Sequence, residues 1–399
     1  MTKYVVLLGD GMADEPHEAF GGLTVMQAAN TPVMDALARR GELGLVNTIP
    51  PGMSPGSDVA NLSAIGYAPE RVYSGRAPLE AASIGVRLAP DETALRTNLV
   101  TLRQAEGGAL VMDDYSAGHI SSDDARPLIE ALNDAFAGDG VKFYPGVGYR
   151  HLGVARGFDD SLKTRAPHDI MGERIDGHLP RGTGADLLNS LMERSRDVFA
   201  NLPENTRLKT PVTQIWFWGQ GKAPTIPTMR EQYGLDGAVV SAVDLVRGIG
   251  VYLGLKVLHV EGATGWLDTN YAGKVAAAVE FLESGGDFVF VHVEAPDECG
   301  HVGKPELKKQ AIEDFDTNVV APMLDYLRTQ PSYRLLILPD HPTPLALRTH
   351  TNSPVPYVLA GSTDVGDATG RGYNEFDAAA TGLVIPSGPD LFRRFLARS

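Results

Sequence analysis

Short apolar runs that alternate with stretches of helical period constrain the fold of this 399-residue chain more than any other feature. Runs of this length, without polar alternation, are typical of strands buried on both faces. Helical stretches separate several of them, which predicts an α/β fold with a mostly parallel sheet flanked by helices. The expected helices include Ala242–Leu253, Tyr271–Leu282 and Glu306–Arg328, and the expected strands are Tyr4–Leu8, Ala238–Ser241, Lys256–Val260, Asp287–Val293, Arg334–Leu338 and Val355–Leu359.

The middle of the chain has a different pattern. Between residues 88 and 181 the alternation gives way to paired strand-like pieces at Val141–Tyr144 and Tyr149–Ala155, with one expected helix at Ser122–Phe136. This pattern predicts a smaller α+β domain inserted into the larger one. We therefore expect a core domain of residues 1–87 and 182–399 and an inserted cap domain of residues 88–181.

The charge and the cysteine content exclude some classes of protein. The net charge of −15 at pH 7 gives no electrostatic basis for nonspecific nucleic-acid binding. No apolar run approaches the roughly 20 residues of a membrane span, and the first residues do not form a signal peptide. The single cysteine, Cys299, forms no intrachain disulfide, which suits a reducing compartment. These features predict a soluble, cytoplasmic protein with no nucleic-acid or membrane partner.

Aspartate and histidine side chains follow the expected strands where each strand ends. Because the carboxyl ends of parallel strands meet at one edge of a sheet, we expect these side chains to cluster. Mixed carboxylate and imidazole ligands suit Mn²⁺ or Zn²⁺ more than Ca²⁺, and two neighbouring ions are a common device of phosphoryl transfer. The residues concerned are Asp10, Asp297, His301, Asp340, His341 and His350.

Ser57 lies where a loop rich in Pro and Gly, residues 50–56, meets a helical pattern. One interpretation is a helix N-cap, because a serine oxygen accepts hydrogen bonds from the free amides of a first turn. The other is a nucleophile whose phosphoserine would lie at a helix N-terminus, where free N–H groups favour negative charge. The segment alone leaves both interpretations open and favours the cap.

Several motifs along the chain resemble the alkaline phosphatase superfamily, and within it the archaeal type of cofactor-independent phosphoglycerate mutase. The resemblance implies an alkaline-phosphatase-like fold and an isomerase that interconverts 3-phosphoglycerate and 2-phosphoglycerate in glycolysis and gluconeogenesis. The implied partner is a small-molecule phosphoglycerate substrate. The resemblance leaves open whether the protein forms a homo-oligomer. The motifs that carry the resemblance are Leu8–Asp14, Pro55–Ser63 with Gly66 and Tyr67, Gly75–Ala82, His292–His301, Asp340–His341 and Thr349–Thr351.

The resemblance also implies a metal centre and rival functions. It assigns Asp10, Ser57, Asp340 and His341 to one metal ion and Asp297, His301 and His350 to a second, with Ser57 phosphorylated during turnover. Mn²⁺ is the expected metal, Zn²⁺, Co²⁺ and Mg²⁺ are the alternatives, and no 2,3-bisphosphoglycerate is required. A phosphopentomutase or a metal-dependent phosphomonoesterase on the same centre is the alternative function. A noncatalytic protein with a regulatory metal site is a third, and the complete ligand set argues against it.

The substrate side is expected in the inserted domain. A phosphoglycerate carries a phosphate and a carboxylate, so arginine and histidine are the expected partners. The resemblance extends to the segments around Arg150 and His168 and favours a functional role for both, with an ordinary solvated surface as the alternative. Asp169 or His151 is the expected carrier of the proton between the two substrate hydroxyls. The substrate-binding candidates are Arg150, His151, His168, Asp169, Arg76 and Lys274.

Overall fold

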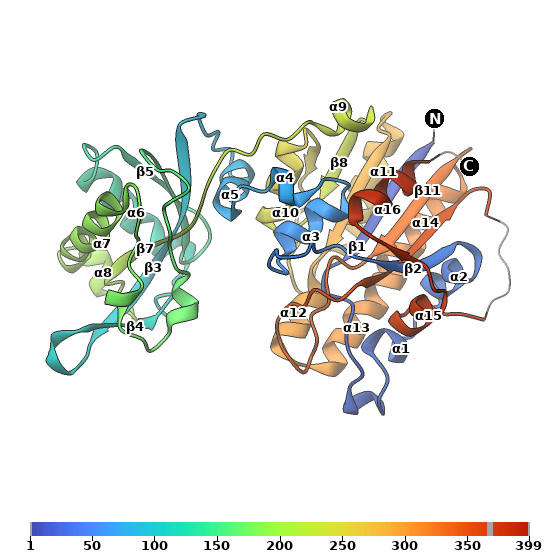
Figure 1. Ribbon diagram of the computed structural model, residues 1–399, viewed down its shortest axis with the longest axis horizontal. Helices are drawn as coiled ribbons and strands as arrows, with labels where there is room; N and C mark the ends of the chain where they lie inside the picture. The colour runs from blue at the N-terminus through green and yellow to red at the C-terminus, as the bar shows by residue number, and fades with distance from the viewer. Residues whose placement is uncertain (1, 365–369, 398–399) are drawn as a thin grey trace. The chain divides into compact units, whose positions relative to one another are not determined.

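The computed structural model, which describes residues 2–364 and 370–397, divides into two compact units (Figure 1). Unit 1 comprises Met1–Tyr73 and Ile226–Ser399, and unit 2 comprises Ser74–Thr225. Unit 2 extends beyond the expected insert of residues 88–181 at both ends. The reason is pairing over a long sequence distance, since β7 (Gln214–Lys222) pairs with β3 (Glu92–Gln104) and α5 (Arg76–Ser83) packs against both strands.

Eight strands form the sheet of unit 1, in the order β13-β2-β12-β11-β1-β10-β8-β9. The five strands from β11 to β9 run parallel, whereas β12 is antiparallel to both of its neighbours. The expected α/β fold with a mostly parallel sheet is therefore confirmed. The strands are β1 (Lys3–Gly9), β2 (Glu42–Val46), β8 (Gly237–Val240), β9 (Lys256–Leu258), β10 (Phe288–Val293), β11 (Tyr333–Leu338), β12 (Val355–Gly361) and β13 (Val384–Ile385).

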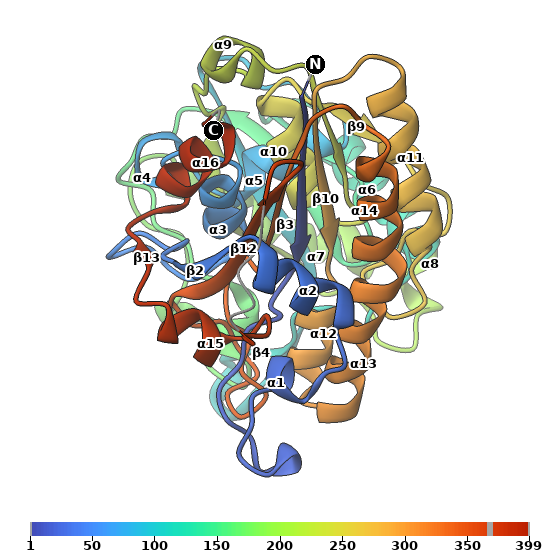
Figure 2. The ribbon, with the colours of Figure 1, turned by 90° about the vertical axis from the view of Figure 1, so that its right-hand side faces the viewer.

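Helices cover both faces of this sheet, which explains why its central strands are largely apolar (Figure 2). One face carries α3 (Ser57–Ala64), α10 (Asp244–Tyr252) and α16 (Gly388–Leu396), and the other carries α2 (Pro32–Arg40), α11 (Tyr271–Glu283) and α14 (Ala321–Arg328). Among the described residues, no helix combines the length and the apolar sequence that a bilayer crossing needs. The remaining α-helices of unit 1 are α1 (Val25–Ala28), α4 (Pro69–Val72), α9 (Met229–Tyr233), α12 (Ala295–Val302), α13 (Pro305–Phe315) and α15 (Glu375–Ala380).

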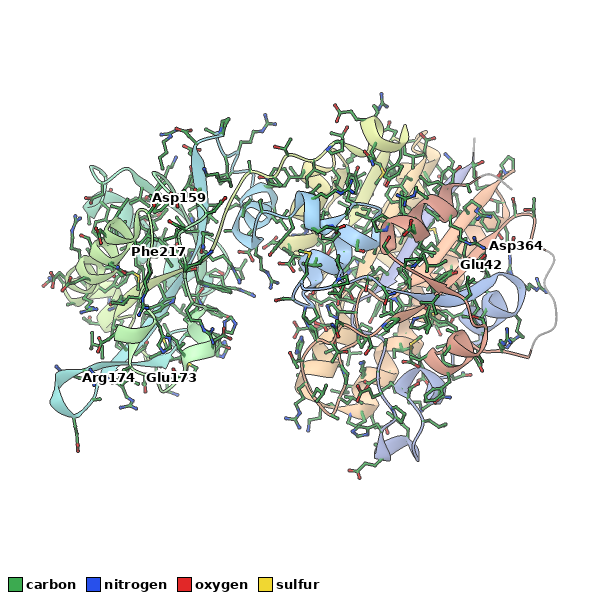
Figure 3. All side chains as sticks on the ribbon, in the orientation of Figure 1. Glu42, Asp159, Glu173, Arg174, Phe217 and Asp364 are labelled. Carbon is green, nitrogen blue, oxygen red and sulfur yellow. The ribbon has the colours of Figure 1, made fainter. Side chains whose placement is uncertain are left out.

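Unit 2 is built on an antiparallel sheet, with β3 at its centre. Helices α6 (Ser122–Ala135) and α7 (Ala185–Ala200) pack against one face through a large apolar core. Phe217 on β7, labelled in Figure 3, lies in this core and stacks with Phe143 at 6.1 Å between ring centroids. Unit 2 thus has the α+β composition expected of the insert. Its other elements are β4 (Leu110–Asp114), β5 (Val141–Tyr144), β6 (Arg150–Arg156) and α8 (Pro203–Thr206).

The register of the unit 1 sheet determines where its loops begin. Gly9 at the end of β1 lies beside Val293 at the end of β10, and Leu8 lies beside Leu338 at the end of β11. The three loops that follow these strands therefore start at the same edge of the sheet. All of the expected metal ligands but Ser57, which begins α3, lie within these loops or the helix α12 that continues one of them.

Candidate active site

Six of the expected ligands gather in two groups at this edge. The first group is Asp10, Asp340 and His341, and the second is Asp297, His301 and His350. Within each group, one possible ligand atom from every residue lies within 4.8 Å of the others. The rings of His341 and His350 stack with their centroids 3.9 Å apart, so the two groups are neighbours.

The first group contains a buried carboxylate oxygen that needs a positive partner. Asp10 is 2% exposed, and its Oδ2 lies 2.9 Å from Nε2 of His292. Its Oδ1 has no hydrogen-bond partner among the described residues. Burial raises the pKa of Asp10 well above its ordinary value, and repulsion from Asp340 and Asp297 adds to the rise. Because a buried carboxylate oxygen that accepts no hydrogen bond and lies among other carboxylates is costly, the donor set fits a divalent cation.

In the second group, two imidazoles converge on one carboxylate. Asp297 and His301 lie one turn apart on α12, with Oδ2 of Asp297 3.2 Å from Nε2 of His301. The other carboxylate oxygen lies 3.4 Å from Nε2 of His350. The Nδ1 atoms of the two histidines lie 3.0 Å and 2.8 Å from the carbonyl oxygens of Arg348 and Pro55. A ring that donates from Nδ1 presents the lone pair of Nε2, which is the arrangement of a metal ligand.

The structure places Ser57 beside the first group. Helix α3 begins at Ser57 with Gly56 as its N-cap residue, so the N-cap interpretation of Ser57 is wrong. The Ser57 hydroxyl instead lies 3.1 Å from Nε2 of His341. One turn later, Nδ2 of Asn61 donates to the Ser57 carbonyl and, at 2.9 Å, to Oδ2 of Asp340, which connects α3 to the first group.

Two residues around the first group escaped the sequence analysis. Asn61 could have been found from the sequence, because it lies four residues after Ser57 on the expected helix and therefore on the same face as Ser57. His292 could also have been found from the sequence, because it is a polar residue inside the apolar run of β10. Its ring is fully buried between Asp10 and the Ser241 hydroxyl, and burial lowers its pKa to about 3. A neutral His292 orients Asp10 without adding charge.

Lys274 is not placed to bind substrate. Its side chain is fully buried in unit 1, and Nζ donates to the carbonyl of His292 at 3.1 Å. Burial lowers the pKa of Lys274 to about 8, although the nearby Glu294 opposes the shift. The prediction that Lys274 contacts the substrate anion is therefore corrected, since this side chain supports the end of β10.

Unit 2 carries a cluster of arginines on the face of its sheet opposite α6 and α7. Arg96 is 6% exposed, its guanidinium lies 3.9 Å from the centroid of the Trp218 ring, and Nε donates to Glu80 at 2.9 Å. Burial lowers the pKa of Arg96 to about 10, and the positive charges of Arg76 and Arg150 act in the same direction while Glu80 opposes them. Three arginines near one another favour an anionic ligand. Arg96 was missed because a strand pattern does not show which polar residues are buried.

Arg150 and His151 face opposite sides of β6, because successive residues of a strand alternate. Arg150 is exposed, whereas His151 is 4% exposed and its Nδ1 accepts a hydrogen bond from the Gly146 amide at 3.1 Å. Burial lowers the pKa of His151 to about 3. A buried imidazole that stays neutral does not fit the expected role in substrate binding and proton transfer, so we correct that assignment.

His168 and Asp169 lie on a short 3-10 turn, Pro167–Ile170, in unit 2. The His168 ring packs edge-on against Trp218, with centroids 5.2 Å apart, and so adjoins Arg96. The Asp169 carboxylate is 47% exposed and lies 3.6 Å from Nε2 of His168. Both side chains are therefore accessible, as their expected roles require.

Substitution of His151 should change how stability depends on pH. A histidine whose pKa falls from about 6.5 in the unfolded chain to about 3 in the folded one stabilises the fold fully above pH 6.5 and loses this contribution as the pH falls. Between pH 7 and pH 5, we expect the protonation of His151 in the unfolded chain to lower the free energy of unfolding by about 2 kcal/mol. His151→Asn, which retains an acceptor for the Gly146 amide, should remove that part of the loss.

Urea unfolding at the two pH values measures the effect. The partly exposed His178, which pairs with Glu173 in unit 2, offers a control variant, His178→Asn. An unchanged pH dependence in His151→Asn would contradict the prediction.

Comparison with known proteins identifies the family. The family model for 2,3-bisphosphoglycerate-independent phosphoglycerate mutase matches residues 38–205. The chain is 54% identical to a probable enzyme of this name from Geobacter sulfurreducens, over 99% of this chain and 100% of that one. It is 50% identical to the enzyme of this name from Methanosarcina acetivorans, over 96% of both chains.

Two solved structures share the fold. A Pyrococcus horikoshii protein, at 30% identity, gives a TM-score of 0.83 over 99% of this chain and 96% of that one. A cofactor-independent phosphoglycerate mutase from Thermoplasma acidophilum, at 25% identity, gives a TM-score of 0.68 over 99% of both chains. With relatives of such identity along its whole length, the chain belongs to the family of 2,3-bisphosphoglycerate-independent phosphoglycerate mutases.

Proposed function

We propose that this mutase interconverts 3-phosphoglycerate and 2-phosphoglycerate through a phosphoserine at Ser57, beside two divalent metal ions. The reaction follows from the family, which works without 2,3-bisphosphoglycerate. The observation that carries the mechanism is the Ser57 hydroxyl, which caps no helix and lies 3.1 Å from His341 in the first ligand group.

We assign one ion to the first group together with Ser57, and the other ion to the second group. The donor chemistry supports this assignment, because each group combines carboxylate oxygen with imidazole nitrogen and one buried oxygen of Asp10 accepts no hydrogen bond among the described residues. Bound divalent ions would lower the proton affinity of the serine hydroxyl and offset charge on the phosphoryl oxygens. Mn²⁺ is the expected ion, and Zn²⁺, Co²⁺ and Mg²⁺ are the alternatives.

The proposed reaction has two phosphoryl transfers. In the first, Ser57 Oγ loses its proton and bonds to phosphorus while the bond from phosphorus to substrate O3 breaks, and O3 takes up a proton. In the second, O2 of the retained glycerate loses its proton and bonds to phosphorus while the bond to Oγ breaks, and Oγ is protonated again. We assign the proton exchanged between O3 and O2 to Asp169, an accessible carboxylate, in preference to the buried His151.

A coupled assay with 3-phosphoglycerate and Mn²⁺, without 2,3-bisphosphoglycerate, tests the proposal. We expect 2-phosphoglycerate with little free phosphate, because the glycerate must stay bound between the two transfers. Release of phosphate at a rival rate would favour a phosphomonoesterase, and turnover of a pentose phosphate alone would favour a phosphopentomutase. That the protein is located in the cytoplasm and that it can form a homo-oligomer remain predictions.

Replacing Arg150 by alanine should weaken substrate binding without loss of metal. The exposed guanidinium is one of the three clustered arginines of unit 2, and a charge-assisted hydrogen bond contributes about 1.5–3 kcal/mol. We therefore expect KM for 3-phosphoglycerate to rise by about 10- to 100-fold. Steady-state kinetics and metal analysis of the same preparation measure both properties.

Arg194→Ala is the matched control, because Arg194 is an exposed arginine of α7, on the opposite face of the sheet, and pairs with Asp139. An Arg150→Ala variant that loses metal but keeps its KM would overturn the assignment of substrate binding to this cluster.

A further inference from the structure

The hydroxyl of Thr343 touches one residue from each ligand group. It donates a short hydrogen bond to Oδ1 of Asp297 in the second group and lies 3.3 Å from Nδ1 of His341 in the first. Thr343 is fully buried. A displacement of this hydroxyl would therefore disturb both groups.

Lys308 on α13 holds Thr343 in place. Its fully buried ammonium group lies 2.8 Å from the Thr343 carbonyl, 2.8 Å from Oδ2 of Asp14 and 3.3 Å from the Ala13 carbonyl. An ammonium group has three protons, and three acceptors receive them here. One nitrogen on α13 thus connects the loop after β1 and the loop after β11, which together carry four of the six ligands, namely Asp10, Asp340, His341 and His350.

Close packing leaves Thr343 little freedom. Its amide donates to the Ala13 carbonyl at 3.2 Å. A Cβ atom at Gly300 would lie 2.7 Å from the Thr343 carbonyl oxygen, and one at Gly11 would lie 2.6 Å from the Thr343 hydroxyl and from Oδ1 of Asp297. Both distances are shorter than a normal contact, so the two glycines allow the loops to approach Thr343. The position of the hydroxyl is therefore determined on several sides.

We propose that Thr343 is a positioning residue that serves both metal groups, and that Lys308 acts through it. The inference rests on the proposed function, since it takes both groups as metal sites. A hydrogen bond from outside the ligand set orients a carboxylate or an imidazole and tunes its affinity for metal. Because one hydroxyl contacts both groups, its removal should weaken both ions rather than one.

Variants with a single intact group test this directly. Asp10→Asn disables the first group and His301→Ala disables the second, and Mn²⁺ is titrated calorimetrically into each metal-free protein. Adding Thr343→Val, which keeps the shape but removes the hydroxyl, should raise the dissociation constant of the remaining ion by about 10- to 100-fold in both backgrounds. Thr343→Ser should stay near the parent. Weakening of one group alone or of neither, or a serine variant as weak as the valine variant, overturns the proposal.

Lys308→Met tests the second part. If Lys308 acts through Thr343, the double variant should lose no more affinity than Thr343→Val alone, whereas additive losses overturn this part. Should Lys308→Met fail to fold, amide hydrogen exchange of Thr343→Val at positions 343 and 345 decides the same question. A backbone that Lys308 holds through the residue 343 carbonyl keeps these two amides protected after the hydroxyl is removed, whereas a free backbone does not.

Controls separate this inference from the proposed function. Ser195→Ala removes a fully buried hydroxyl in unit 2, which donates to the Met192 carbonyl, and should leave Mn²⁺ affinity unchanged. A wild-type protein that binds fewer than two ions defeats the proposed function. A wild-type protein that binds two ions, with unchanged affinity in Thr343→Val, defeats only the role of Thr343.

Discussion

Ser57→Ala should abolish mutase turnover while leaving the fold unchanged. Removal of a nucleophile that bonds to phosphorus should reduce kcat by at least about 10⁴-fold. The free energy of unfolding should change by no more than about 0.5 kcal/mol, because Gly56 and not Ser57 occupies the N-cap position of α3. The coupled assay measures the first effect and urea unfolding the second.

The exposed Ser54, in the same loop, gives a matched control in Ser54→Ala, which should retain wild-type kcat. Quenching the wild type during turnover of phosphate-labelled 3-phosphoglycerate should place the label on the peptide that contains Ser57. Label on another residue, or substantial turnover by Ser57→Ala, would show that the phosphoserine assignment is wrong.

Removal of divalent metal should abolish turnover and lower thermal stability, and Mn²⁺ should restore both. The first group holds buried carboxylates whose repulsion, after burial itself, keeps the pKa of Asp10 high. A bound cation relieves that repulsion in the folded state only. An ion at 100 times its dissociation constant adds about 2.7 kcal/mol to the free energy of unfolding. Differential scanning calorimetry before and after chelation measures the gain.

The number of ions distinguishes two groups from one. Metal analysis of fully active protein should find two ions per chain, and His301→Ala should retain one. His178→Ala, which changes a partly exposed histidine of unit 2, should retain two. One ion or none in fully active wild type would contradict the assignment of both groups.

The sequence by itself determined the class of fold and the composition of the two candidate ligand groups. Apolar runs reveal strands buried on both faces because burial excludes polar side chains from them, and β1, β10 and β11 lie where such runs predict. Parallel strands bring their carboxyl ends to one edge. Residues directly after them, such as Asp10 and Asp340, are therefore placed by local sequence and a general rule of topology. The sequence also shows that side chains alternate between the two faces of the strand β6, which places Arg150 and His151 on opposite faces.

Only the tertiary structure decided which of the polar side chains are exposed and which are bound to one another. Lys274 lies on α11, and its buried ammonium group donates a hydrogen bond to the carbonyl of His292 near the end of β10. A residue that was expected to bind substrate therefore supports a strand instead. Unit 2 starts and ends outside the expected insert because β7 joins its sheet through pairing with β3. Lys308 and Asp14 form an ion pair across 294 positions of sequence, and Thr343 reaches Asp297 across 46. Periodicity and motif spacing describe neighbours along the chain, whereas these contacts arise when separate loops pack at one sheet edge.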